Sequence, residues 1–214
     1  MTEQTVETST ARPRTERGLE RLIFFSDAVV AIAITLIVLP LVDSAREVAN
    51  ESTAKFLSDN SYALLAAAIS FAVISAFWRE HHSLFERATG YTPLLLRVNM
   101  FWLVGIVALP VASVLDVYSH RDPLAAGAYL IAVIFTMTMD RLEELILYRA
   151  RLLSDGDRIT GPQLLLRWSM VVAAGIALIV ALTQPGVGLW SLLLVFAAGQ
   201  FEAIMTRRLR ARTA

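Results

Sequence analysis

Long apolar runs alternate with short polar segments along this chain of 214 residues. Six of these runs approach the roughly 20 residues that a helix needs to cross a bilayer. Because a backbone in lipid must satisfy its own hydrogen bonds, the pattern predicts six transmembrane helices and an all-α membrane protein. The predicted spans are 22–42, 62–78, 94–115, 124–139, 164–183 and 187–205.

The fourth apolar run is the shortest, and we expect its helix to continue through residues 141–153. The acidic and basic residues at 140–144 then predict a solvated helix end, with Asp140 and Glu144 on one face and Arg141 paired locally. Between the fifth and sixth runs, Gln184-Pro185-Gly186 is typical of a tight turn.

The placement of basic residues predicts the orientation of the chain. With six spans, 16 of the 19 Lys and Arg residues fall on one side of the membrane, which leaves Arg46, Lys55 and Arg121 on the other. Since cytoplasmic loops carry the excess of Lys and Arg, both termini are predicted to be cytoplasmic.

Composition narrows the classes of function and the division of the chain. The sequence is 56% hydrophobic, contains no cysteine and has a formal net charge of zero. This removes disulfides and thiol chemistry and gives no overall bias toward nucleic acid. We expect a disordered cytoplasmic tail over 1–20, a six-helix transmembrane domain over 21–206 and a basic cytoplasmic tail over 207–214.

The predicted topology brings polar residues of three helices to one depth near the cytoplasm. Asp27 lies in the first turns of the first span, where an ionised side chain must find a partner or water. Two readings of Asp27 stay open: a structural clamp between helices, and a cation attractor or proton acceptor. The donors available at its depth are Arg21, Trp78, His81, His82 and Asn99.

A stripe of Ile32, Thr35, Leu36 and Leu39 follows on the same predicted helix. At about 100° per residue, the centre of the stripe lies about 130° from Asp27. If the stripe faces a pore, the Asp27 carboxylate therefore faces neighbouring helices. The spacing alone is equally typical of packing or lipid contact.

Two adjacent histidines follow Trp78-Arg79-Glu80. Neighbours on a helix point about 100° apart, so His81 and His82 cannot chelate one ion together. His82 and Glu86 have i, i+4 spacing, but two ligands are too few for a structural metal site. We expect hydrogen-bonding histidines, no structural metal and no cofactor.

These residues also resemble a known family. Arg21-x-x-x-Phe25-Ser26-Asp27, followed by the apolar segment 28–36, is similar to the first-helix signature of the transmembrane protein 175 family of lysosomal and bacterial potassium channels. The residues that follow in the second and third spans, Trp78, His81-His82 and Asn99, also resemble the pattern of that family.

The resemblance implies a homotetramer of six-helix subunits in which four copies of the first helix surround a central pore. It implies an apolar constriction at Ile32, with Leu36 and Leu39 further out, and potassium preference at Thr35. It also implies an inter-helix polar network of Arg21, Ser26, Asp27, Trp78, one or both of His81 and His82, and Asn99.

The resulting hypothesis is a potassium-permeable cation channel of the bacterial plasma membrane, without enzymatic activity. Its expected partners are potassium ions in the pore, the lipid bilayer and further copies of the chain. Two rivals remain: a proton-coupled secondary transporter that uses Asp27, and a membrane enzyme that uses Asp27, His81 and His82.

Overall fold

The computed structural model describes residues 16–47, 52–119, 122–154 and 161–184. Every regular element in these ranges is a helix, and an isolated bridge joins Ala88 to Leu153. The helices are α1 (Glu16–Leu36), α2 (Leu39–Glu47), α3 (Thr53–Asp59), α4 (Ser61–Phe85), α5 (Pro93–Tyr118), α6 (Pro123–Ala150) and α7 (Gly161–Thr183).

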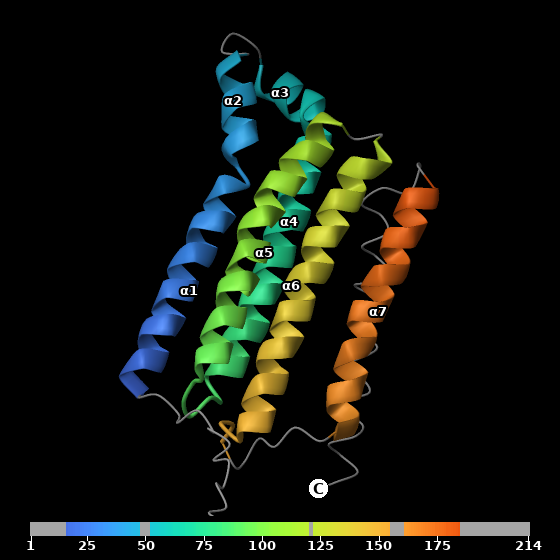
Figure 1. Cartoon of the computed structure of the whole chain (residues 1–214). Coiled ribbons are helices and arrows are strands. Elements are labelled where there is room, and N and C mark those ends of the chain that lie inside the picture. Colours follow the sequence, from blue (N-terminus) through green and yellow to red (C-terminus); the bar gives the residue numbers. More distant parts are fainter. Residues whose placement is uncertain (1–15, 48–51, 120–121, 155–160, 185–214) are drawn as a thin grey trace, which may run out of the picture.

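The long helices run up and down in one bundle (Figure 1). Helix α5 lies at its centre and contacts α1, α4 and α6, while α7 packs on the far side of α6. The N-terminus of α1, the C-terminus of α4 and the N-terminus of α5 lie at the same end of the bundle (Figure 1). The prediction that these three ends meet at one level is therefore confirmed.

Local sequence explains where two of these helices start. Thr92 precedes α5, and its Oγ1 accepts a hydrogen bond from the Leu95 amide at 3.1 Å. Asp122 precedes α6 and accepts from the Leu124 amide at 2.9 Å. A proline follows each cap, where its missing N–H costs the helix nothing.

The first predicted span is interrupted, so the prediction of one continuous helix over 22–42 is wrong at residues 37–38. Helix α1 ends at Leu36, and α2 begins at Leu39 in a new direction (Figure 1). Pro40 explains the break, because it has no N–H for the Leu36 carbonyl and its ring clashes with that carbonyl in a continuous helix. The angle assigned to Leu39 on the first-helix stripe consequently does not hold.

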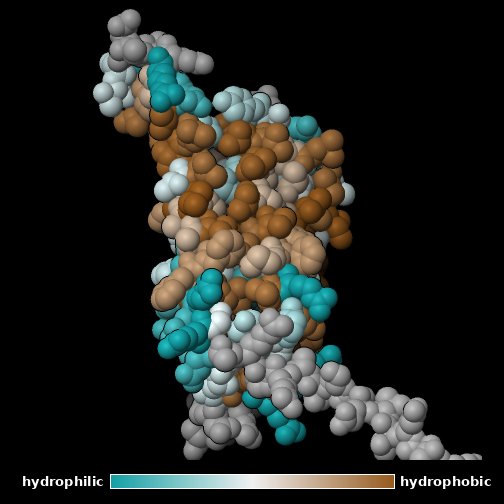
Figure 2. Space-filling view, turned by 60° about the vertical axis from the view of Figure 1, so that its left-hand side comes forward, coloured by the Kyte–Doolittle hydropathy of each residue, from teal (hydrophilic) through white to brown (hydrophobic). Residues whose placement is uncertain are grey.

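Five segments of the described chain are long and apolar enough to span a membrane: Glu16–Arg46, Ser61–Phe85, Pro93–Tyr118, Pro123–Ala150 and Leu165–Thr183. Figure 2 shows the corresponding apolar belt, with hydrophilic side chains gathered toward the two ends of the molecule. The sixth predicted span, 187–205, and the turn after Gln184 lie outside the described residues. The protein is thus all-helical over its described part, with five of the predicted spans present as helices.

A close approach of two helices fixes the centre of the bundle. Trp102, Ile106 and Tyr129 are fully buried between α5 and its neighbours. At Gly105 of α5, an added Cβ would lie 2.3 Å from Oγ1 of Thr136 on α6. Only glycine therefore allows the two helices to lie this close at that point.

Replacing Gly105 with alanine should lower the melting temperature of the purified protein, since the short Thr136 side chain cannot move out of the way. We expect a loss of about 1–3 kcal/mol in the free energy of unfolding, the usual cost of overpacking. Gly175→Ala is the matched control, because an added Cβ there meets no atom of the described residues within 4 Å. Equal melting temperatures for the two variants would contradict the close contact.

Candidate functional site

A chain of hydrogen bonds joins α1, α5 and α4 near the end of the bundle where these helices meet. Ser26 Oγ lies 2.9 Å from the Leu22 carbonyl oxygen, Asn99 Nδ2 lies 2.9 Å from Ser26 Oγ, and His81 Nε2 lies 2.9 Å from Asn99 Oδ1. The side chains of Ser26, His81 and Asn99 are all buried. Three helices are thus tied together by one polar connection inside an apolar surrounding.

The chemistry of the Leu22 carbonyl fixes the direction of every bond in this chain. A carbonyl only accepts, so the Ser26 hydroxyl donates to it and accepts from the Asn99 amide nitrogen. The Asn99 carbonyl oxygen then faces His81 and accepts from Nε2. His81 therefore carries a hydrogen on Nε2, which in the neutral ring leaves Nδ1 unprotonated.

Asp27 takes part in a second, separate contact. Trp78 Nε1 donates to Asp27 Oδ1 at 2.9 Å, which links α1 to α4 beside the first chain. The Trp78 ring stacks on His82 at 5.3 Å, and His82 Nε2 lies 3.2 Å from Glu86 Oε1 on the exposed side of α4. Of the donors expected for Asp27, the structure supplies Trp78.

The two histidines have different surroundings. His81 is buried between the rings of Trp102 at 4.1 Å and Phe85 at 4.3 Å, and it joins the chain to Ser26. His82 reaches Asp27 only through the stacked Trp78 ring. Arg21 is exposed at the start of α1, and the structure does not bring it to either contact among the described residues. Sequence reasoning could not assign these places, since neighbouring positions differ by only one step around the helix.

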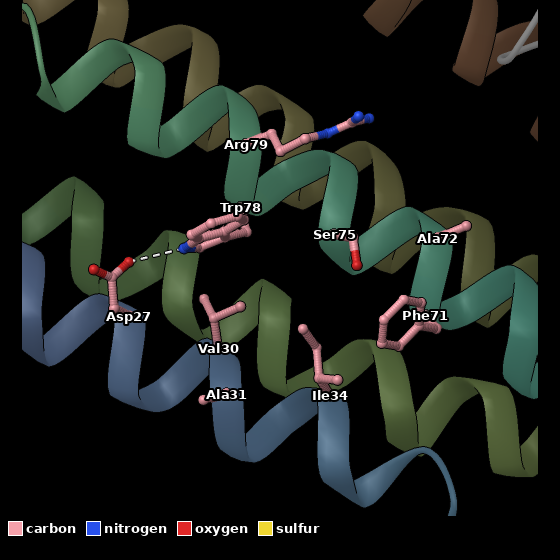
Figure 3. A pocket seen from close by; sticks show the side chains of 9 residues that line it. All are labelled: Asp27, Val30, Ala31, Ile34, Phe71, Ala72, Ser75, Trp78 and Arg79. Atoms are coloured by element: carbon pink, nitrogen blue, oxygen red, sulfur yellow. Dashed lines mark hydrogen bonds between the residues drawn. The ribbon is translucent and has the colours of Figure 1, made fainter.

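A groove of about 670 Å³ opens between α1 and α4 beside the Asp27–Trp78 bond. In Figure 3, Asp27 and Trp78 close one end of it, while Val30, Ile34 and Phe71 lie along its length. The Asp27 carboxylate therefore lies at the edge of the packed bundle, half-buried, with an apolar wall next to it. The remaining lining residues are Ala31, Ala72, Ser75 and Arg79.

The other predicted residues lie on the outer face of α1 and beyond its end. Ile32 is 61% exposed and Leu36 is 41% exposed, on the side of the helix that faces away from the chain's own bundle. Thr35 is also exposed, and its hydroxyl donates to the Ile32 carbonyl of the same helix at 2.7 Å. Leu39 is 52% exposed but belongs to α2. The structure keeps this face apart from Ser26 and Asn99.

A buried charged cluster connects α4, α6 and α7, where the sequence predicted a solvated helix end. That prediction is wrong, because each of the charged residues of α6 in the cluster is at most 3% exposed. Arg141 contacts Glu80, Asp140 and Glu144, and Arg167 contacts Glu144. The local pairing expected for Arg141 is confirmed. The cluster consists of the buried residues Asp140, Arg141, Glu143 and Glu144 of α6, with Glu80 of α4 exposed and Arg167 of α7 partly exposed at its edge.

The charged residues at 140–144 form a pattern that fits both a solvated and a buried arrangement. Several charges within a few residues at the end of an apolar run are typical of a helix leaving the membrane. Here the bundle extends past them, and α7 supplies Arg167 to cover Glu144. Since the partners come from α4 and α7, no local pattern on α6 distinguishes the buried arrangement from the solvated one.

Replacing Asn99 with leucine should remove the bridge between α1 and α4. His81 then keeps a buried donor without an acceptor, at an expected cost of about 1–3 kcal/mol in the free energy of unfolding. Unfolding by detergent titration measures this loss. Asn60→Leu is the control, because among the described residues the Asn60 side chain bonds to the Phe56 carbonyl, one turn earlier in the chain. The same loss for both variants would mean that the bridge adds nothing.

Replacing Arg141 with methionine should lower the free energy of unfolding more than the loss of a charge from an exposed residue does. The substitution leaves buried carboxylates without their cation, which typically costs about 3–5 kcal/mol. We expect the folded fraction, measured by size-exclusion chromatography after heating, to fall sharply. In Arg46→Met, an exposed pair to Asp43 at 3.5 Å is lost, with an expected change of about 0–1 kcal/mol. Comparable heat resistance of the two variants would refute the buried pairing.

The sequence of the chain is similar to a family model and to several known proteins. The family model described as "Endosomal/lysosomal potassium channel TMEM175" matches residues 21–110. A protein of Danio rerio named "Endosomal/lysosomal proton channel TMEM175" is 33% identical over 136 residues, and one of the same name from Gallus gallus is 38% identical over 100 residues. A protein of Chryseobacterium sp. named as a potassium channel is 30% identical over 122 residues.

These matches cover part of each protein. The match to the Danio protein covers 58% of this chain and 25% of that protein. For the Gallus protein the shares are 44% of this chain and 20% of that protein, and for the Chryseobacterium protein they are 55% and 61%. The chain thus aligns with less than two thirds of the length of each relative. The family match over 21–110 contains both the Ser26–Asn99–His81 chain and the Asp27–Trp78 bond. On these findings, the chain is similar to the TMEM175 family over residues 21–110.

Proposed function

We propose that the chain is a subunit of a potassium-permeable cation channel in the bacterial plasma membrane, with both termini in the cytoplasm. Four copies assemble around a central pore lined by α1, and the protein needs no cofactor and catalyses no reaction. Similarity to the TMEM175 family over residues 21–110 and the potassium-channel name of the Chryseobacterium relative support this proposal.

The observation that carries the proposal is the second apolar face of α1. One face buries Val30 and Ala33 in the bundle, and the opposite face exposes Ile32 and Leu36. In a symmetric assembly, this exposed face can turn toward the axis while the buried face holds α1 to its own subunit. The same exposure also suits lipid contact, which is why the test below compares an exposed isoleucine on another helix.

A ring of four Ile32 side chains provides a gate by a simple physical route. A narrow apolar constriction holds water poorly, so a small displacement of α1 switches it between a dry and a wet state. Leu36 extends the constriction outward, and Leu39 forms a separate outer level because Pro40 breaks the helix. Thr35 bonds back to its own helix, which leaves its oxygen able to accept from water around a passing ion.

In this proposal, the polar contacts at the other end of α1 set its position. The Ser26–Asn99–His81 chain and the Asp27–Trp78 bond hold α1 against α4 and α5 at two neighbouring points. Asp27 then acts as a clamp from behind the pore and not as an ion ligand inside it. Any rotation of α1 must strain or break these two connections.

The proton is a second candidate for the permeant ion. The relatives from Danio rerio and Gallus gallus are named proton channels, and the Asp27 carboxylate lies half-buried at the edge of a groove. Reversal potentials in opposed potassium, sodium and proton gradients separate the two ions. Saturable, proton-driven uptake without unitary currents would instead favour a secondary transporter that uses Asp27.

Ile32→Ala should widen the constriction and raise potassium flux into liposomes that contain the purified protein. Ile32→Asn should raise it further and weaken the discrimination between potassium and sodium, because a polar ring stays hydrated. Both effects are measured as flux per protein and as reversal potential.

Ile131→Ala is the matched control, since Ile131 is 57% exposed on α6 and Ile32 is 61% exposed on α1. We expect Ile131→Ala to conduct like the unchanged protein. If the Ile32 variants also conduct like the unchanged protein, Ile32 does not line the pathway. A mass measurement in detergent tests the tetramer in the same preparation.

A further inference from the structure

Glu143 of α6 is the most isolated ionisable group in the described part of the chain. It has no exposed surface, and neither of its carboxyl oxygens has a hydrogen-bond partner among the described residues. The group that approaches it is His81, whose Nε2 lies 3.9 Å from Glu143 Oε2. A buried carboxylate without a donor is strongly disfavoured, whereas the protonated acid carries no charge.

The neighbouring charges do not relieve this cost. The cluster has four carboxyl groups, Glu80, Asp140, Glu143 and Glu144, and two guanidinium groups. Arg141 contacts the three carboxylates other than Glu143, and Arg167 contacts Glu144. Asp140 lies within electrostatic reach of Glu143 and repels a negative charge there. The balance of charge therefore favours a proton on Glu143.

His81 is placed between two possible acceptors. His81 Nε2 donates its hydrogen to Asn99 Oδ1 at 2.9 Å, and Glu143 Oε2 lies 3.9 Å from the same nitrogen. An ionised carboxylate is a stronger acceptor than a neutral amide oxygen, because a charge-assisted bond is about twice as strong. The bond to Asn99 is consequently favoured only while Glu143 stays neutral.

We propose that Glu143 is a proton-binding site that controls the connection between α4 and α1. With the proton bound, His81 donates to Asn99 and the chain to Ser26 holds α1. When the O–H bond of Glu143 breaks and the proton leaves to water, the His81 N–H turns to the new carboxylate. Asn99 then loses its donor, and although it still donates to Ser26, the route from α4 through Asn99 to α1 is interrupted.

Several other charged groups face this pair and set the conditions for the switch. On α6 these are Asp140, Arg141 and Glu144, and on α7 it is Arg167. Glu80 and His82 on α4 and Asp27 on α1 complete the set. The cluster lies at the end of the bundle predicted to face the cytoplasm, so cytoplasmic alkalinisation is the expected trigger.

Nuclear magnetic resonance of the protein in liposomes tests the switch without any current. The chain has three histidines, and the ring nitrogens are labelled with nitrogen-15. The signal missing from His81→Gln identifies His81. We expect its Nε2 resonance to shift between mildly acidic and mildly alkaline pH, and Glu143→Gln to abolish that shift. An Nε2 resonance that stays constant in the unchanged protein, or that still shifts in Glu143→Gln, overturns the proposal.

Infrared spectroscopy of the unchanged protein provides a measurement that does not require Glu143→Gln to fold. With carbon-13 in the glutamate carboxyl groups, a buried protonated carboxyl absorbs at an isotope-shifted carbonyl frequency. Loss of that band at the pH at which the His81 resonance shifts supports the proposal. Absence of the band at acidic and neutral pH contradicts it. Glu86→Gln is the control, since Glu86 is exposed on α4 and should leave both signals unchanged.

The effect on ion flux rests on the proposed channel function and is measured separately. Potassium flux should depend on the pH of the cytoplasmic side in the unchanged protein and in Glu86→Gln, and this dependence should be lost in Glu143→Gln. Spectroscopic shifts without any flux would leave the proton site standing and reject the channel. Flux with the same pH dependence in Glu143→Gln would leave the channel standing and reject the control by Glu143.

Discussion

A backbone carbonyl that can only accept a hydrogen bond determines the arrangement at the end of the bundle where α1, α4 and α5 meet. Because the Leu22 oxygen takes the hydrogen of Ser26, each later group in the chain has one available direction. The result is a defined hydrogen on His81 and a defined orientation of Asn99. In an apolar bundle, such a directed chain specifies how three helices meet more sharply than side-chain packing does.

Helix α1 has two different faces, one packed in the bundle and one exposed. The buried side of the helix carries Ser26, Val30 and Ala33, and its exposed side carries Ile32 and Leu36. Helices α5 and α6 form a close pair around Gly105 and therefore provide a fixed frame. Helix α1 contacts this frame through α5 and has its polar ties confined to one end. This distribution separates the polar contacts of α1 from its exposed apolar side chains.

Sequence reasoning succeeded where the physics was local or where topology added a constraint. Hydropathy predicted the five spans that the described residues contain, and alternation of the spans brought Asp27, Trp78, His81 and Asn99 to one level. It failed at Pro40, because the apolar run continues through this residue and hydropathy does not detect a helix break inside such a run. It also failed at 140–144, because burial there depends on Arg167 and Glu80 from helices far away in the sequence. A pattern within one helix carries no information about such partners.

The break after Leu36 has one further consequence. Proline at position 40 leaves the Leu36 carbonyl oxygen without the amide that would bond it in a continuous helix. Hydrocarbon offers no replacement donor, so this oxygen must meet a polar group or a solvent molecule at its own depth. The segment around residues 36–40 is thus the place on this apolar span where a backbone oxygen requires a polar group or water beside it.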